Sequence, residues 1–436
     1  MSLTINSTIS TIENTKISTL QFATIFICFF MNMLDGMDVM IISYSAPSIA
    51  KELAISAQVL GSVFSAGLVG MTIGTLFIAP YADIFGRRTI ILLSAFWMGL
   101  MVFATSYAQS VEQLLFFRCL SGIGIGSVLA STATLTSEYA PMRTKDFWVS
   151  FVMGGYPIGA VLSGLAAAQI IPMYGWRTMF QTAGIATLVM LPLIFFFLSE
   201  SLDFLLKKQP KDALQKVNVI LNKMNKVPLI NLPTRTDELI KKPSVRALLT
   251  PERKTGTLQL WLAIFLALSA LYFLTNWIPK LASITGLSVA LAIYAGTVFN
   301  LGAFVGIITQ GYLSGRFGLR KTIFSFFTMT AILMVIFGLV KGSVFVLILF
   351  GLIGFGIQGG FVGLYAVAAR MYPTEIRTTG VGFAMSSGRI GGIIGPILAG
   401  FLIGMGISVA TNFMIFALPI FCAGVAALLI KSKEIA

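Results

Sequence analysis

The sequence of 436 residues has no histidine, only three cysteines and few charged side chains. Charged residues make up 11% of the chain, against about 25% in a soluble globular domain, while 57% are hydrophobic. So few polar residues cannot cover the surface of a water-soluble protein of this length. Without histidine, proton transfer must use carboxylates. Cys28, Cys119 and Cys422 all lie in apolar segments, so we predict no disulfide framework, metal site or cofactor.

Long apolar stretches recur along the chain, each sufficient for a transmembrane helix of about 20 residues. The predicted fold class is an all-α membrane protein, because barrel strands give a weaker hydropathy pattern. Twelve transmembrane helices are expected near residues 20–46, 58–79, 90–108, 113–137, 147–170, 177–198, 258–279, 287–311, 321–340, 343–370, 379–404 and 408–430. The predicted domains are a tail (1–19), a six-helix bundle (20–198), a linker (199–257), a second bundle (258–430) and a tail (431–436).

The basic residues are unevenly placed between the predicted spans. Of 30 lysines and arginines, 24 fall on the side that holds both termini and four on the opposite side. This asymmetry predicts that both termini are cytoplasmic, and we expect a multi-pass monomer in a bacterial inner membrane. The placement of these charges between spans argues against nucleic acid as a partner. Within the linker, the apolar spacing from Lys211 to Lys226 predicts an amphipathic helix.

The two halves of the chain repeat each other at an offset of 232 residues. The matching positions are mostly glycines: Gly70, Gly74, Gly122 and Gly124 correspond to Gly302, Gly306, Gly354 and Gly356. Such a repeat predicts two pseudo-symmetric six-helix bundles. Secondary transporters are commonly built in this way, with the substrate site between the repeats.

A short basic loop follows the second span of each half. It reads APYADIFGRR at Ala79–Arg88 and GYLSGRFGLR at Gly311–Arg320. Both copies resemble the G-x-x-x-D-R-x-G-R-R loop of the major facilitator superfamily, although Ala79, Ile84 and Gly315 depart from it. The resemblance implies bundles that rock about a central site. The predicted gating residues are Asp83, Gly86, Arg87, Arg88, Glu138, Arg316, Gly318 and Arg320. The alternative is that the arginines only anchor the topology.

Four ionisable residues lie well within predicted spans: Asp35, Asp38, Arg118 and Arg389. A charge at mid-bilayer costs roughly 2.5–3.5 kcal/mol on insertion scales, so each is a candidate functional residue. Asp35 and Asp38 are three residues apart on one helix face, where two carboxylates repel and can exchange a proton. We predict that they couple protons to transport. The alternative is a structural ion pair with one of the arginines.

The arginines are candidates for binding an anion, because a guanidinium can hold a carboxylate through two hydrogen bonds. Arg118 could bind substrate or neutralise the acid pair. Arg389 is flanked by glycines that would leave room for a ligand, with a packing salt bridge as the alternative. Gln358, Tyr272 and Trp277 complete the predicted substrate site, and further tyrosines that could line it are Tyr44, Tyr156, Tyr294 and Tyr365.

The Asp-Gly-x-Asp element at 35–38 and the Gly-Arg-Ile-Gly element at 388–391 resemble the aromatic acid/proton symporter family within the superfamily. In that family, the first-span aspartates and the eleventh-span arginine are needed for transport, which points to Asp35, Asp38 and Arg389. The resemblance implies proton-coupled import of an organic carboxylate, such as benzoate or a hydroxybenzoate. The alternatives are import of a ring-cleavage dicarboxylate such as muconate, or drug/proton antiport. An enzyme is not expected, because no nucleophile or metal constellation is visible.

Overall fold

The structure, a computed structural model, describes residues 17–141, 144–233, 248–339, 342–372 and 376–430. These residues form helices and no strands. The first half comprises α2 (Thr19–Glu52), α3 (Ala57–Ile73), α4 (Ala82–Phe85), α5 (Arg87–Thr105), α6 (Val111–Tyr139), α7 (Lys145–Met153) and α8 (Gly155–Phe197). The second half comprises α11 (Lys254–Ile284), α12 (Val289–Phe317), α13 (Leu319–Ile336), α14 (Ser343–Met371), α15 (Arg377–Gly404) and α16 (Val409–Leu429).

Eleven segments of the described chain are long and apolar enough to cross a membrane. One of them, Phe147–Phe197, contains 51 residues, which would extend about 76 Å as a straight helix. This is more than twice the ~30 Å hydrocarbon core. The segment also breaks at Gly175, where φ is 82° and ψ is 168°. It therefore accounts for two crossings, and the prediction of twelve transmembrane helices is confirmed.

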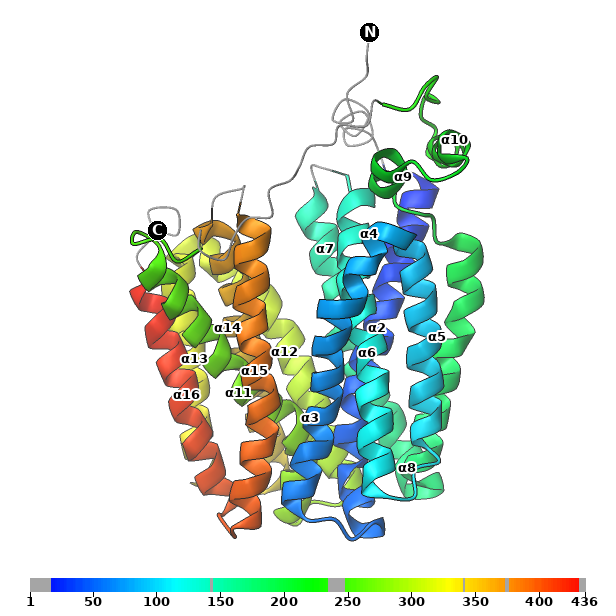
Figure 1. The fold of residues 1–436 in the computed structure, drawn as a ribbon. Coiled ribbons are helices and arrows are strands. Elements are labelled where there is room, and N and C mark those ends of the chain that lie inside the picture. Colours follow the sequence, from blue (N-terminus) through cyan, green and yellow to red (C-terminus); the bar gives the residue numbers. More distant parts are fainter. Residues whose placement is uncertain (1–16, 142–143, 234–247, 340–341, 373–375, 431–436) are drawn as a thin grey trace.

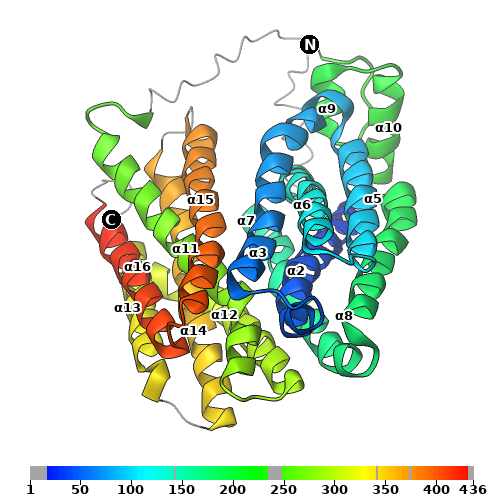
Figure 2. The same ribbon diagram turned by 60° about the horizontal axis from the view of Figure 1, so that its bottom comes forward.

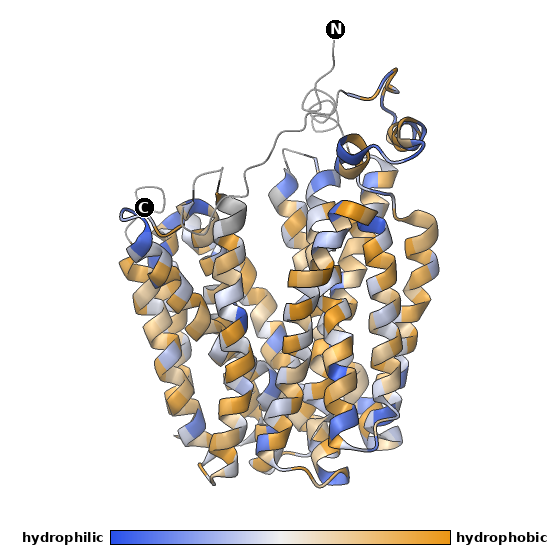
Figure 3. Cartoon of the chain, viewed as in Figure 1, coloured by the Kyte–Doolittle hydropathy of each residue, from blue (hydrophilic) through white to orange (hydrophobic). Residues whose placement is uncertain are grey.

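Local sequence explains many of the helix boundaries. Serine side chains accept a hydrogen bond from the first turn of the helix that follows, as Ser18 does before α2 and Ser110 does before α6. Gly86 and Gly318 separate the second and third spans of the two halves, with φ of 97° and 87°. Side chains rarely adopt this conformation, so glycine permits the tight turn at both places. Figure 3 shows apolar residues along the helices and hydrophilic residues gathered toward their ends.

The internal repeat extends to the contacts between helices. Gly74, the residue directly after α3, packs against the carbonyl of Ile123 on α6, and its counterpart Gly306 on α12 packs against the carbonyl of Phe355 on α14. Ile123 and Phe355 are themselves counterparts at the same offset of 232. Glycine is needed at both places because a Cβ atom would occupy the position of the carbonyl oxygen. The predicted pseudo-symmetry of the bundles is therefore confirmed at the level of single contacts.

The two halves meet at one end of the bundle and separate toward the other (Figures 1 and 2). We call the end where α2 begins and α16 ends the terminal end, and the opposite end the far end. Toward the far end, Ser65 Oγ on α3 donates to the carbonyl of Ile393 on α15 at 2.7 Å. Ser43 Oγ on α2 donates to the carbonyl of its own counterpart, Thr275 on α11, at 2.9 Å. The halves are thus closed at the far end and apart at the terminal end.

The linker forms two short helices, α9 (Leu202–Lys208) and α10 (Ala213–Lys223), at the terminal end of the first half. α10 lies within the predicted amphipathic segment, and its apolar residues Val217, Ile220 and Leu221 are buried. Tyr139 at the end of α6 donates its hydroxyl to the carbonyl of Glu200 at 2.6 Å. The start of the linker is therefore attached to the first half.

Candidate functional site

Two of the four intramembrane charges form a buried ion pair inside the first half. Arg118 Nη1 on α6 lies 2.8 Å from Asp38 Oδ1 on α2, and each side chain is only 3% exposed. The second guanidinium nitrogen donates to the Asp38 carbonyl at 3.4 Å, and the ring of Phe180 lies 5.9 Å away. Of the two roles open for Arg118, neutralising the acid pair is the one that this arrangement favours.

Asp35 lies one helical turn before Asp38 on α2 but takes no part in the ion pair with Arg118. Its side chain is 1% exposed, and both carboxylate oxygens are buried without a hydrogen-bond partner in the described part of the chain. The neighbouring Gly36 packs against the backbone of Tyr156 on α8, which allows α2 and α8 to approach closely. The two predicted proton-coupling residues therefore differ: Asp38 is paired and Asp35 is not.

Arg389 on α15 reaches this region from the second half. It is half-buried, and its charge acts on Asp35 as well as on Tyr272 of α11 and Tyr365 of α14. Among the described residues it forms no ion pair. The structure thus brings together Asp35 and Arg389, which are 354 positions apart in the chain, across the interface between the halves.

The glycines beside Arg389 have a different role from the expected one. Gly391 packs against the carbonyl of Phe265 on α11, and Gly392 lies against the ring of Tyr272. They bring α15 close to α11 instead of leaving space for a ligand. This close packing is what places the Arg389 side chain near Tyr272.

Tyrosines from both halves surround the acid and the arginine. Tyr156 on α8 interacts electrostatically with Asp35 and with Tyr272 across the interface. Tyr365 is 44% exposed and packs edge-on against Phe361 at 5.6 Å. Tyr156 and Tyr365 belonged to a wider set of aromatic candidates, because a sequence with many aromatic residues does not mark which of them face inward.

Two predicted substrate residues lie differently from the rest. Trp277 is fully buried, and its indole nitrogen donates to the carbonyl of Pro396 at 3.1 Å. Its ring meets Phe64 of the first half edge-on at 5.2 Å, so it belongs to the closed contact toward the far end. Trp277 is therefore not among the residues that the structure brings together around Asp35 and Arg389. Gln358 is half-buried on α14, seven residues before Tyr365 and hence two turns along the same face.

The predicted gating loop of the first half is tied into a network at the terminal end. Arg87 forms an ion pair with Glu138 at the end of α6 and lies 3.5 Å from Asp83. Ser201 Oγ donates to Glu138 at 2.5 Å. All these partners belong to the first half and its linker, so in this conformation Asp83 pairs within its own half and is otherwise exposed.

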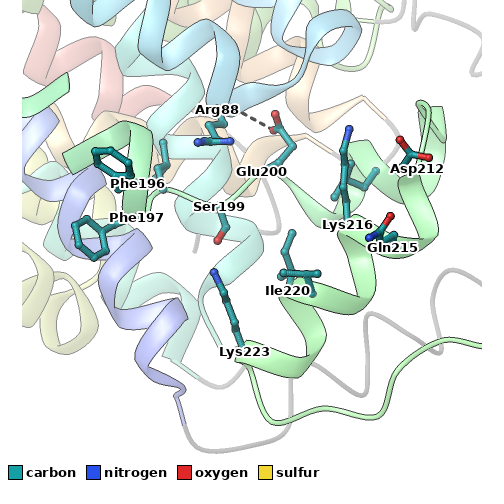
Figure 4. Close-up of a pocket in the computed structure, with 13 residues that line it drawn as sticks. Arg88, Phe196, Phe197, Ser199, Glu200, Asp212, Gln215, Lys216, Ile220 and Lys223 are labelled. Atoms are coloured by element: carbon teal, nitrogen blue, oxygen red, sulfur yellow. Dashed lines mark hydrogen bonds between the residues drawn. The ribbon is translucent and has the colours of Figure 1, made fainter. Parts of the chain in front are cut away.

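Glu200 is connected to this network because its carboxylate accepts the backbone N–H of Ser201 at 2.8 Å. Figure 4 shows its further hydrogen bond to Arg88. Its carboxylate accepts the backbone N–H of Arg88 at 3.1 Å, and the Arg88 guanidinium donates to the carbonyl of Phe195. A Cβ atom at Gly86 would collide with this carboxylate. A cavity of about 500 Å³ lies here between the end of α8 and α10, lined by Arg88, Lys216 and Lys223 among others. It is at the terminal end, remote from Asp35.

The second copy of the loop makes few polar contacts with the rest of the described structure. Arg316 is exposed beside the ring of Phe317, at 5.6 Å. Arg320 donates to the carbonyl of Ile430 at 2.6 Å, and a Cβ atom at Gly318 would meet nothing within 4 Å. No ion pair involves this copy among the described residues.

The fold has twelve spans in two repeats, and it places Asp35 of the first half near Arg389 of the second. These features are typical of a secondary transporter. The family model described as Major Facilitator Superfamily matches residues 28–310 and 260–435. Solved structures show the same fold: the xylose transporter XylE from E. coli, in an inward-open conformation, gives a TM-score of 0.73 at 16% identity, covering 95% of this chain and 98% of that chain.

Curated relatives give a narrower assignment. A gallate transporter from Pseudomonas putida is 30% identical, covering 96% of this chain and 93% of the relative. A 4-hydroxybenzoate transporter from Acinetobacter baylyi is 32% identical, with 95% and 92% covered. A 3-(3-hydroxy-phenyl)propionate transporter from Escherichia coli is also 32% identical, with 94% of each covered. The chain belongs to the aromatic acid/proton symporter family of the Major Facilitator Superfamily, and it is a membrane transporter of small molecules, not an enzyme.

Proposed function

We propose that this protein imports an aromatic carboxylate, such as benzoate or a hydroxybenzoate, together with protons. The observation that carries the proposal is the proximity of Arg389 to Asp35. Among the described residues Arg389 forms no ion pair, and it lies close enough to interact electrostatically with a buried carboxyl group that has no hydrogen-bond partner there. Relatives that transport gallate and 4-hydroxybenzoate support the aromatic class of substrate.

Arg389 is the proposed binding group for the substrate carboxylate, because its guanidinium can donate two parallel hydrogen bonds to it. Tyr156, Tyr272 and Tyr365 surround this position from three helices. Their rings can pack against an aromatic substrate, and their hydroxyl groups can bond to a ring hydroxyl. Gln358 is a further proposed hydrogen-bond partner. Trp277 is left as a contact between the halves.

Coupling follows from the cost of burying unpaired charge. Closing the terminal end around the site would enclose the half-buried Arg389 without an anion, while Asp35 is already buried without a partner. A buried charge without a partner is unfavourable at both residues. Binding of a carboxylate at Arg389 and of a proton at Asp35 removes both costs, so the loaded protein changes conformation more readily than the half-loaded one. In this conformation Arg118 neutralises Asp38, so Asp35 is the proposed proton carrier.

The gating role falls mainly on the first copy of the loop. The network of Arg87 with Asp83 and Glu138 stabilises the first half at the terminal end while the halves are apart. Asp83 is the residue placed to exchange partners when the end closes, since its side chain is 73% exposed.

The terminal end is the proposed cytoplasmic side, because the lysines and arginines concentrate there. The chain would then lie in a bacterial inner membrane with both termini inside, open toward the cytoplasm in this conformation. It acts as a monomer with its own substrate path between the halves, and nucleic acid is not a partner.

Uptake of labelled benzoate and 4-hydroxybenzoate into vesicles with an imposed pH gradient tests the function. We expect accumulation that depends on the gradient, with protons entering alongside the substrate. Uptake that is indifferent to the gradient would contradict proton coupling.

A competition panel tests the substrate class. Asp38 pairs with Arg118, so Arg389 is the one of the two intramembrane arginines that is left to bind a carboxylate, and this favours a monocarboxylate over muconate. Competition by muconate as strong as that by benzoate would contradict this assignment. Efflux of cationic drugs in place of acid uptake would support the antiporter alternative.

A further inference from the structure

A line of buried polar side chains runs along α2 from Asp35 to the terminal end. Its members follow one another at intervals of three or four residues, and so share one helix face: Asp35, Asn32, Cys28, Thr24 and Gln21. Each is at most 2% exposed. Fourteen residues separate its two ends, a distance of about 21 Å along the helix. We call this line, together with its partners on α6, the polar seam.

Side chains of α6 complete the polar seam. Asn32 Nδ2 donates to Thr132 Oγ1 at 3.3 Å, and Gln21 Nε2 donates to the carbonyl of Tyr139 at 2.7 Å. The Tyr139 hydroxyl in turn donates to the carbonyl of Glu200 at 2.6 Å. The seam therefore lies inside the first half, between α2 and α6, and leads to the start of the linker.

Hydrogen bonding within the seam is incomplete. Four buried oxygens have no hydrogen-bond partner within the described parts of the chain: both carboxylate oxygens of Asp35, Oδ1 of Asn32 and Oγ1 of Thr24. Folded proteins commonly satisfy such atoms with internal water, which typically makes about three hydrogen bonds. Oxygens spaced along one helix face, next to the donors and acceptors of α6, offer a succession of positions for such waters.

The second half provides a natural comparison, because it has the same helix packing with a mostly apolar lining. Of the seam residues on α2, Gln21 alone has a charged counterpart, the half-buried Arg253. At the offset of 232, the residues that correspond to Thr24, Cys28, Asn32, Asp35 and Thr132 are Gly256, Leu260, Ile264, Ala267 and Leu364. The four with larger side chains than glycine are all fully buried. A polar lining is therefore no requirement of the fold, and it occurs in the half that contains the acid pair.

We propose that the polar seam holds a chain of water molecules that carries protons between Asp35 and the terminal end of the first half, separate from the path of the substrate between the halves. This inference rests on the proposed proton coupling. The O–H bond of protonated Asp35 breaks and its proton passes to the adjacent water. Each water then passes one of its own protons to the next, one proton leaves near Tyr139, and Asp35 remains as a carboxylate.

Other ionisable groups surround Asp35 but lie outside the seam: Asp38, Arg118, Tyr156, Tyr272 and Arg389. They set the charge around the carboxyl group. The seam continues from Asp35 into the first half toward the terminal end, with Cys28 and Tyr139 as its further ionisable members.

Thr132→Val and Asn32→Leu test the route, with Thr134→Val as the matched control. Thr134 is on the same helix, but its side chain is exposed and its hydroxyl bonds only to the carbonyl of Ala130. In vesicles, we compare benzoate uptake driven by a pH gradient with exchange of labelled for unlabelled benzoate, which needs no net proton movement. The seam variants should lower net uptake at least about tenfold, equivalent to 1.36 kcal/mol in a barrier, and leave exchange within about twofold. The control should change neither.

Unchanged gradient-driven uptake in both seam variants would overturn the proposal, and so would a parallel loss of exchange. Failure of the proposed function has a different signature, since the unmodified protein itself would then show no gradient-driven uptake. Hydroxyl-radical footprinting gives a readout that needs no transport. Cys28 in the seam should be oxidised by hydroxyl radicals formed from the internal water beside it, whereas Met98, equally buried outside the seam, should stay unmodified. Equal protection of the two would also overturn the proposal.

Discussion

The two halves of this transporter share a scaffold but differ in the residues placed on it. Gly74 and Gly306 make the same contact in the two halves, with Ile123 and Phe355 as corresponding partners. The charged residues follow no such symmetry: Arg118 corresponds to the buried Phe350, and Arg389 corresponds to Pro157. The comparison teaches that backbone packing maintains the repeat, while each half can acquire its own chemistry at equivalent positions.

The largest expected effect comes from breaking the buried ion pair of the first half. Arg118→Met leaves Asp38 buried without a partner and should lower the free energy of unfolding by about 3–5 kcal/mol. Phe350→Met, at the corresponding position of the second half, should cost only roughly 1 kcal/mol. Thermal unfolding in detergent measures both. The double variant Asp38→Asn/Arg118→Met should recover much of the loss, and no recovery would show that the pair is not the cause.

The second-largest effect is expected from replacing Arg389, the intramembrane arginine of the second half. Arg389→Gln should weaken benzoate binding by about 2–5 kcal/mol, or at least roughly 30-fold, because a buried charged partner of the substrate is lost. Ligand-induced thermal stabilisation or calorimetry measures the change. Arg316→Gln removes an exposed arginine of the same half and should bind benzoate normally. Normal binding by Arg389→Gln would remove this residue from the substrate site.

The acid of the first half should affect coupling more than binding. Asp35→Asn keeps the size of the side chain but cannot release a proton, so gradient-driven uptake should fall at least about tenfold. Exchange of labelled for unlabelled substrate should persist. Loss of both activities together would indicate that Asp35 serves substrate binding or folding and not proton transfer.

The smallest effect is expected on the rate of uptake, and it should differ between the two copies of the basic loop. Arg87→Gln breaks the network with Asp83 and Glu138 and should slow uptake by roughly fivefold, or about 1 kcal/mol. Arg316→Gln, in the second copy, should change the rate less than about twofold. Initial rates in vesicles, normalised to the amount of inserted protein, measure the difference. Equal effects would contradict the assignment of gating mainly to the first half.

Much of this architecture follows from patterns that are local in the sequence. The apolar stretches, the glycines Gly86 and Gly318 in the short loops, and the helix in the linker are all visible from neighbouring residues. Their boundaries could be predicted because bilayer thickness and helix geometry determine how long a span must be. The break at Gly175 also agrees with the sequence, since the predicted spans 147–170 and 177–198 leave this residue between them.

The partners within the site could not be predicted in this way. Asp35 and Asp38 could not be distinguished in the sequence. Only the packing of α2 against α6 shows that Arg118 forms its ion pair with Asp38. The glycines around Arg389 were expected to make room for a ligand, yet they serve the contact with α11. Trp277 and Tyr272 were both predicted to bind substrate. The structure instead places the Trp277 ring against Phe64, in the contact between the halves toward the far end.

The sequence by itself determined that this is a twelve-span transporter built from two repeats, and which few residues place charge in the membrane. Composition, spacing and the 232-residue offset are properties of the chain, so they need no knowledge of how the helices meet. Only the tertiary structure decided that one acid is paired and the other left open, and that Arg389 faces it from the second half. These relations depend on side chains brought together from distant helices, where a shift of one helical turn would select a different partner.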